Sequence, residues 1–339
     1  MRGSVDPRRT ALAAVGALLV NATVWGLSWI PFRALDGLGV HSLWTTTWIY
    51  ALSTAAVIAC YPRALARLLG SRWLLLLALA AGLTNACFNW GVTVGEVVRV
   101  VLLFYLMPVW AAVFARLLLG ERTGAGAAVR IALAIGGAFV VLWQSDGLPG
   151  LPSSLADWLG VAGGAAFALT NVLLRKQAAD PPEARALAMF AGGLAVPGAL
   201  ALALSWAAAG APLADAPRAA ADLLSAAAHS RVAWPATGTT IALIATATAA
   251  VFLASNLALQ YGAARLPSNV TAVVMLAEVV VAAVSSALLG NEPLTARTLA
   301  GGAMIIAASL LAAFAQPGLS RRRSGGADPA PAPRPPGRA

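Results

Sequence analysis

Long apolar stretches follow one another along almost the whole chain, and short segments between them carry most of the charge. Ten stretches approach the roughly 20 residues that a helix needs to cross a hydrocarbon core. Backbone groups in lipid must be satisfied within their own segment, and no porin-like alternation of apolar and polar residues is present, so we expect helices. The predicted spans are 11–32, 42–60, 73–92, 97–119, 127–143, 157–174, 185–205, 239–261, 268–289 and 298–314.

Composition agrees with this pattern. The chain has 339 residues, of which 60% are hydrophobic and 11% charged, whereas a soluble domain carries about 25% charged residues. The mean hydropathy is +0.79. The first span has no small-residue cleavage site before the second, so it is predicted to be a retained helix and not a signal peptide. The sequence therefore predicts an all-α, multi-pass membrane protein with ten transmembrane helices and the lipid bilayer as a partner.

Basic residues give an orientation. With the N-terminus in the cytoplasm, and counting as far as Arg323, fifteen Lys and Arg of the loops and tails fall on the cytoplasmic side and five on the outer side, so the positive-inside rule places both termini in the cytoplasm. The net charge of +10 is then a topology signal, and nucleic-acid binding, which needs a basic patch on a soluble surface, is not predicted. Residues 1–10 are a predicted cytoplasmic N-terminus and 317–339 a disordered cytoplasmic tail. The outer loop 207–234 contains "PRAAADLLSAAAH", either a short interfacial helix or plain linker.

The chain also repeats itself. Displaced by 171 positions, "NACFNWG" (85–91) falls on "NLALQYG" (256–262), and "VWAAVFARLLLGE" (109–121) falls on "VVAAVSSALLGNE" (280–292). A displacement of 142 lays "WGLSWIPFR" (25–33) on "FALTNVLLR" (167–175). We therefore predict two repeats, 11–144 and 155–316, of five spans each. An odd number of spans makes the second repeat enter the membrane from the opposite side, and such inverted repeats place a transport site at their interface near the midplane.

One carboxylate stands out in this setting. Glu278 lies ten residues into the ninth predicted span, so it is about 15 Å deep at 1.5 Å per residue. An acid at that depth costs roughly 2.5–3.5 kcal/mol on insertion scales, and such acids are usually functional. Burial favours the protonated form. Glu278 is thus a candidate to exchange a proton that drives transport, or to bind the ammonium group of an amino acid. The alternative is a protonated acid that bonds a neighbouring helix and holds the bundle together.

Polar amides share helix faces in two other spans. Asn85 and Asn89 are four residues apart, as are Asn256 and Gln260, and this spacing puts both members on one face. These faces are expected to point inward, either to a substrate pathway or to hydrogen bonds between helices worth about 1 kcal/mol or less. The predicted pathway also contains Asn171 and five aromatic residues that could instead pack in the core: Trp25, Trp29, Trp90, Tyr105 and Tyr261. Helices 1, 3, 4, 6, 8 and 9 are predicted to line it, and helices 5 and 10 to lie at the periphery or at a dimer contact.

Charges near the span ends have structural interpretations. Glu121 and Glu292 each precede a helix, where a carboxylate is favoured at the N-terminus, and Glu96 and Arg99 are predicted to pair locally. Enzyme chemistry is not predicted: there are two histidines, no HExxH motif, no Cys/His metal spacing and no Walker-type loop. No cofactor, metal or catalytic residue is expected, and Cys60 and Cys87 lie in predicted spans, which argues against a disulfide. A channel is disfavoured because no ring of charges or filter loop is visible.

Several motifs together resemble the drug/metabolite transporter superfamily, EamA-type branch. They are the "WG" of the first span, "MPVWA" followed by "LLLGER" in the fourth, and "AAVSSALLGNEPLT" in the ninth. The ninth span is also similar to that of threonine/homoserine exporters. The resemblance implies an inner-membrane carrier that exports amino acids, drugs or small metabolites, with a proton as a possible coupling ion and a homodimer as a possible assembly. An organophosphate or nucleotide-sugar antiporter of the same fold is the main alternative, and a membrane enzyme a weaker one. Members commonly have Glu-Pro in the ninth helix; here Val279 follows Glu278, while Pro108 stands at the equivalent place in the fourth, which argues against a mechanism that needs a proline kink in both copies.

Overall fold

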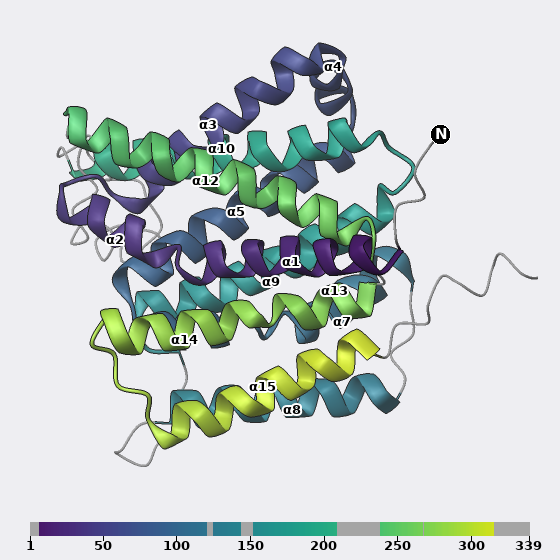
Figure 1. The fold of residues 1–339 in the computed structure, drawn as a ribbon, viewed down its shortest axis with the longest axis vertical. Coiled ribbons are helices and arrows are strands. Elements are labelled where there is room, and N and C mark those ends of the chain that lie inside the picture. The colour runs from purple at the N-terminus through teal and green to yellow at the C-terminus, as the bar shows by residue number, and fades with distance from the viewer. Residues whose placement is uncertain (1–6, 121–124, 144–151, 209–237, 267, 315–339) are drawn as a thin grey trace, which may run out of the picture.

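The computed structural model describes residues 7–120, 125–143, 152–208, 238–266 and 268–314, and every regular element among them is a helix (Figure 1). In the first half of the chain the helices are α1 (Pro7–Gly26), α2 (Trp29–Gly37), α3 (Ser42–Cys60), α4 (Pro62–Gly70), α5 (Arg72–Val94), α6 (Val97–Phe104), α7 (Met107–Leu119) and α8 (Ala125–Leu142). In the second half they are α9 (Leu155–Lys176), α10 (Pro182–Ala208), α12 (Thr239–Ala263), α13 (Ser268–Met275), α14 (Ala277–Leu289) and α15 (Ala296–Phe314).

Seven of the described helical stretches are long and apolar enough to cross a membrane: Thr10–Gly37, Ser42–Cys60, Arg72–Val94, Val97–Leu119, Leu155–Lys176, Pro182–Ala207 and Thr239–Ala263. Three shorter apolar helices cover Ala128–Leu142, Val273–Leu289 and Ala296–Leu311. The all-helical architecture is therefore confirmed for the described residues, and its long apolar helices are consistent with a membrane protein, whereas the count of ten crossings remains a prediction. Most of the outer loop 207–234, the tail 317–339 and Glu121 lie outside the described residues.

Three of the predicted spans are interrupted. The first breaks between α1 and α2, the fourth at Tyr105 and Leu106 between α6 and α7, and the ninth at Leu276 between α13 and α14. At the last two breaks the backbone tightens to bonds over three residues, from Leu106 N to Leu103 O (3.1 Å) and from Leu276 N to Val273 O (3.2 Å). These breaks lie 171 positions apart, the displacement of the sequence repeat. The ninth segment breaks although it contains no proline. The absence of the Glu-Pro pair therefore does not make this segment a continuous helix.

Helices α8 and α15 lie side by side along one edge of the bundle (Figure 1). Glycines allow their close approach, because a Cβ on Gly137 would come within 2.6 Å of the Gly301 carbonyl oxygen. This edge position agrees with the peripheral place predicted for the fifth and tenth spans. In the interior, α5 packs on α9 and α10, and α1 packs on α12 and α14.

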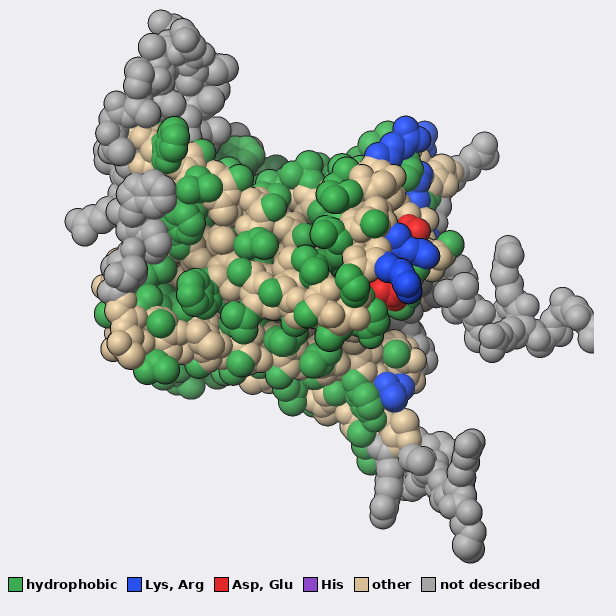
Figure 2. Space-filling model, turned by 90° about the horizontal axis from the view of Figure 1, so that it is seen from above, with side chains coloured by type: hydrophobic (Ala, Val, Ile, Leu, Met, Phe, Trp, Pro, Cys, Tyr) green, Lys and Arg blue, Asp and Glu red, His purple; other side chains and the backbone are tan. Residues whose placement is uncertain are grey.

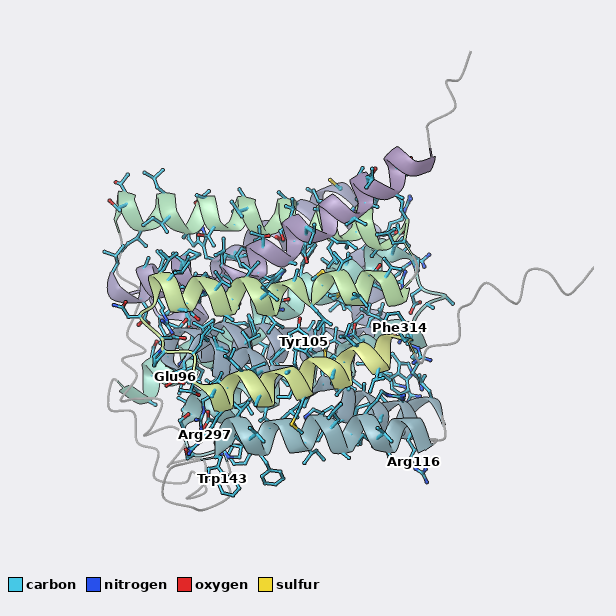
Figure 3. The ribbon with its side chains drawn as sticks, turned by 60° about the horizontal axis from the view of Figure 1, so that its bottom comes forward. Glu96, Tyr105, Arg116, Trp143, Arg297 and Phe314 are labelled. Atoms are coloured by element: carbon cyan, nitrogen blue, oxygen red, sulfur yellow. The ribbon has the colours of Figure 1, made fainter. Side chains whose placement is uncertain are left out.

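The two ends of the bundle differ in charge. Figure 2 shows Lys and Arg side chains gathered at one end of the described surface. Arg116 and Phe314 lie at this end, which we call the basic end, and Glu96, Trp143 and Arg297 lie at the opposite end, which we call the Glu96 end (Figure 3).

At the Glu96 end, Glu96 attracts the charge of Arg99 as predicted, but it is not the hydrogen-bonding partner of Arg99. Arg99 instead binds Asp157 through two hydrogen bonds of 2.6 and 3.0 Å. Asp157 is buried and closes the capping box of α9 with Ser154. Glu96 precedes the first turn of α6 and makes no side-chain cap.

Candidate functional site

Glu278 lies in the first turn of α14, directly after the break at Leu276. Its side chain is partly buried. The N-terminus of a helix carries a partial positive charge from its free N–H groups, which favours a carboxylate there. The sequence predicts that this acid lies deep in the membrane. The break places it beside the partial positive charge of a helix N-terminus.

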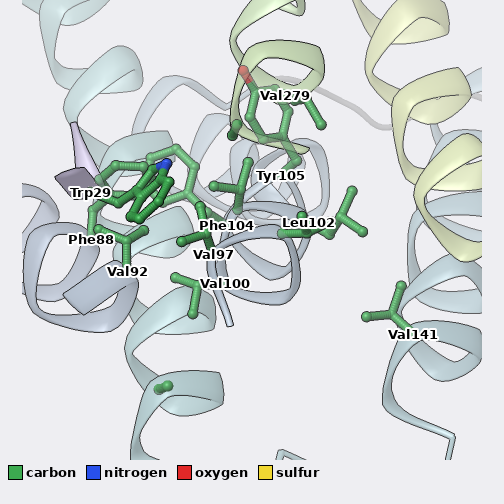
Figure 4. Close-up of a cluster of buried hydrophobic side chains, with 14 of the residues drawn as sticks. Trp29, Phe88, Val92, Val97, Val100, Leu102, Phe104, Tyr105, Val141 and Val279 are labelled. Atoms are coloured by element: carbon green, nitrogen blue, oxygen red, sulfur yellow. The ribbon is translucent and has the colours of Figure 1, made fainter. Parts of the chain in front are cut away.

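Tyr105 provides the second part of the site. It lies at the break of the fourth segment, and its hydroxyl makes a side-chain hydrogen bond with the Glu278 carboxyl. Figure 4 shows the Tyr105 ring directed toward α14, beside Val279. The two interrupted segments therefore meet through a hydroxyl from one and a carboxyl from the other.

Gly26 brings the backbone of α1 directly onto α14 at this point. A Cβ on Gly26 would lie 2.8 Å from the carbonyl oxygen of Glu278 and 2.8 Å from the Cβ of Val281. The indole nitrogen of Trp29 donates to the Ser285 hydroxyl at 3.1 Å, one turn further along α14. This contact explains the glycine of the "WG" motif in the first span. Because Gly26 has no side chain, α1 can approach the helix that carries Glu278.

A cluster of aromatic rings continues from Trp25. The ring of Trp25 is 4.9 Å from Phe252 and 6.0 Å from Phe88, centre to centre. Phe88 contacts Phe104 at 4.9 Å, and Phe104 contacts Phe167 at 5.3 Å. These rings come from α1, α12, α5, α6 and α9, so five helices meet around the residue next to Gly26.

Sequence reasoning missed the phenylalanines of this cluster. Phe88 stands inside "NACFNWG", between the two amides that were chosen as pathway residues. At about 100° per residue it lies about 60° around α5 from Asn85 and about 100° from Asn89. Phe88 therefore borders the face that carries the amides, and only the tertiary structure shows that its ring contacts Trp25 while the amides contact α3.

The amides of α5 face α3. The Tyr50 hydroxyl donates to the Asn85 side-chain oxygen at 2.7 Å, and the Asn89 amide donates to the Thr46 hydroxyl at 3.0 Å. Trp90 is buried nearby and contacts the ring of His41 at 5.1 Å. The structure places these predicted pathway residues at a contact between helices, which was the alternative considered for them.

His41 lies outside the apolar spans, at the N-cap of α3. Its Nδ1 accepts a hydrogen bond from the backbone N–H of Leu43 at 3.2 Å. Burial lowers the pKa of His41 to about 4, because desolvation penalises the charged imidazolium. The ring is therefore neutral at pH 7, as an accepting Nδ1 requires.

The remaining predicted residues have contacts within their own helices. The Asn256 amide donates to Phe252 O at 2.9 Å, and the exposed Asn171 amide donates to Phe167 O at 3.0 Å. Gln260 and Tyr261 are exposed, and the guanidinium of Arg265 lies 3.7 Å from the centre of the Tyr261 ring. None of these contacts joins the four residues to Glu278.

A second polar contact closes the Glu96 end of the same helices. Arg33 donates to the Glu292 carboxylate at 2.7 Å, to Gly95 O at 2.7 Å and to Val92 O at 3.1 Å. The other Glu292 oxygen accepts from the Val97 N–H at 2.8 Å. Glu292 thus caps α6, whereas the sequence suggested the helix that follows it. Its partners lie 195 or more positions away, so local sequence could not reveal them.

Comparison with known proteins gives one family. Residues 12–143 match the EamA-like transporter family. The matched region contains Trp25, Gly26, Trp29 and Tyr105, and Glu278 lies beyond it. This part of the chain is therefore similar to a family of transporters, and the match covers less than half of the 339 residues. No curated protein matches the chain.

The fold is also similar to a known crystal structure. The TM-score is 0.51 at 16% sequence identity, and the alignment covers 91% of this chain and 98% of the other. At this identity the likeness concerns the fold alone. It extends over both halves of the chain, beyond the region with the EamA-like match.

Proposed function

We propose that the protein is a secondary transporter of the inner membrane that exports amino acids or other small metabolites by alternating access. The observation that carries the proposal is the meeting of Glu278 with Tyr105 at the breaks of two helices. Secondary transporters place their sites at broken helices near the membrane midplane, where half-helix ends interact with charged groups. An ionisable residue in such a position marks a substrate or proton pathway.

The proposed topology has ten crossings in two inverted repeats of five, with both termini in the cytoplasm. Seven long and three shorter apolar helices coincide with the ten predicted spans. The breaks at Tyr105 and Leu276 have the same 171-residue separation as the repeated sequences. The gathering of Lys and Arg at one end (Figure 2) supports a cytoplasmic basic end.

Glu278 is the proposed coupling group. The carboxyl takes up a proton when the site opens to the outside and releases it when the site opens to the cytoplasm, while solute moves outward. The Tyr105 hydroxyl is the hydrogen-bonding partner of this carboxyl at the start of α14. The proposed pathway is centred on Glu278, Tyr105, Trp25 and Trp29.

The surroundings of this site favour neutral or cationic solutes over phosphates. An antiporter of organophosphates or nucleotide sugars needs basic side chains that are free to meet the anion. Arg33 and Arg99 are engaged by Glu292 and Asp157 toward the Glu96 end. The rings around Trp25 instead offer apolar surface and faces suited to a cation.

Transport by purified protein in liposomes tests the proposal. With an imposed pH gradient, we expect saturable movement of labelled threonine or homoserine against its own concentration gradient, and no exchange of labelled glucose 6-phosphate for phosphate. Collapse of the pH gradient should abolish accumulation but leave downhill movement. Exchange of glucose 6-phosphate without movement of either amino acid would replace the proposal by the antiporter.

A further inference from the structure

The short helix α4 connects two helices that can cross a membrane. It follows Ser42–Cys60 and precedes Arg72–Val94. Its Ala64 and Leu68 are 2% and 4% exposed and belong to an apolar cluster with residues of α5 and α10, among them Leu77 and Leu187. The helix is thus anchored on the bundle along one side, while its other side chains are exposed.

The exposed surface of α4 has two opposite faces. Tyr61, Leu65 and Leu69 are 53%, 38% and 66% exposed, and their spacing of four residues puts them on one face. Arg63 and Arg67 share a second face, which lies roughly 180° around the helix axis from the first at about 100° per residue. Both arginines are exposed.

This pattern is typical of a helix that lies in the membrane interface. Such helices place an apolar face about 5–10 Å into the boundary between headgroups and acyl chains and carry Lys or Arg on the other face. The position of α4 between two candidate spans puts it at the surface of the bilayer. The exposed apolar face therefore continues the lipid-facing surface of the bundle, and the arginines come to the level of the headgroups.

Two further cations lie beside the end of α4. Arg72 begins α5, and the Lys176 ammonium from the end of α9 lies 4.1 Å from the centre of the Trp73 ring. The Arg72 guanidinium lies 5.5 Å from the same ring. Within the described parts of the chain, Arg63, Arg67 and Arg72 have no carboxylate partner. Their charge is available to an anion outside the protein.

We propose that Arg63, Arg67, Arg72 and Lys176 form a binding surface for the headgroups of anionic phospholipids in the leaflet at the basic end. The apolar face of α4 sets the depth, and the four cations meet the lipid phosphates. A basic residue near an anionic membrane surface contributes about fivefold in affinity, or about 1 kcal/mol. The surface fixes α4, and through Ala64 and Leu68 the adjoining ends of α5 and α10, against the bilayer.

Lipid binding by the purified full chain tests this surface. Native mass spectrometry is used to compare phosphatidylglycerol with phosphatidylcholine adducts. The wild-type chain should retain phosphatidylglycerol preferentially, and R63Q/R67Q should lower its apparent affinity by about 10- to 30-fold without changing phosphatidylcholine binding. R63K/R67K should keep the preference, because it conserves the charge, and R297Q should also keep it, because Arg297 lies at the opposite end (Figure 3).

Three results would overturn the proposal. They are an unchanged preference in R63Q/R67Q, an equal loss in R297Q, and equal competition by soluble glycerol phosphate, which would indicate a phosphate site without a role for lipid. If R63Q/R67Q does not fold, the wild-type preference must still fall as salt is raised, because exposed charges are screened. A preference that is insensitive to salt contradicts the surface. None of these results depends on which solute is transported.

Discussion

The fourth and ninth predicted spans break at equivalent positions, but different residues surround the two breaks. In the fourth, Pro108 lies in the first turn of α7, just after Tyr105. In the ninth, no proline is present, and the turn after Leu276 carries Glu278. Proline at the start of a helix is tolerated and favours an entry at that point. The ninth segment shows that this local signal is not required for a break.

Packing accounts for the break that lacks a proline. Gly26 places the α1 backbone against the carbonyl of Glu278, and the Trp29 indole is bonded to Ser285 further along α14. These contacts hold α14 as a separate unit, and its first turn is closed by the bond from Val279 N to Leu276 O at 3.1 Å. The two segments thus share a geometry and differ in chemistry, with a hydroxyl on one and a carboxyl on the other.

The largest expected effect on transport comes from replacing Glu278, a carboxylate that has no counterpart in the fourth segment. E278Q keeps the size and hydrogen bonding of the side chain but cannot titrate. We expect solute transport in liposomes to fall on the order of 100-fold, with normal insertion and yield. E96Q is the matched control, because Glu96 is exposed and makes no helix cap, and it should transport normally. Wild-type rates and pH profile in E278Q would show that the acid is structural.

The next largest effect is expected from a substitution at Gly26, where α1 contacts α14. In G26A the new methyl group must displace the backbone of α14, because its nearest neighbours lie at 2.8 Å. Overpacking of this kind costs about 1–3 kcal/mol, so thermal unfolding in detergent should shift downward and transport should fall with it. Gly16 of the same helix has no atom within 4 Å of its Cβ position, and G16A should be neutral or slightly stabilising. Equal stability of the two variants would refute the close contact.

Tyr105 should have a smaller effect that is confined to activity. Y105F removes only the hydroxyl that bonds Glu278. A hydrogen bond to a charged group contributes about 1.5–3 kcal/mol, so we expect transport to fall about tenfold while unfolding changes little. Y61F, at an exposed tyrosine, is the control. If both variants transport alike, the hydroxyl has no role at the site.

The smallest effect is predicted for Pro108. The ninth segment breaks without a proline, so P108A should leave the fourth segment broken and transport within about twofold of wild type, because proline in a first turn blocks no helical bond. Distances between spin labels on α6 and α7 would report any straightening. A loss of transport accompanied by a longer α6–α7 distance would show that the proline sets the break.

Apolar patterning was enough to predict the apolar helices, because these depend on local composition, whereas the depth of Glu278 in the membrane stays a prediction. The spacing of Asn85 and Asn89 correctly put them on one face of α5, but that face meets Tyr50 and Thr46 of α3. Which helix a face meets depends on tertiary packing. The same holds for Glu292, whose partner Arg33 is 259 positions away, and for the break at Leu276, which has no proline to mark it.

Proton movement across the liposome membrane tests the role of Glu278 most directly. Liposomes that contain the protein, a trapped pH-sensitive dye and the transported solute are diluted into solute-free buffer at equal pH. If Glu278 links the two fluxes, downhill movement of solute through the wild-type protein will drive protons in the opposite direction, and E278Q will show no proton movement even where residual solute flux is detected. Proton movement in E278Q that keeps its wild-type ratio to the solute flux would contradict the account.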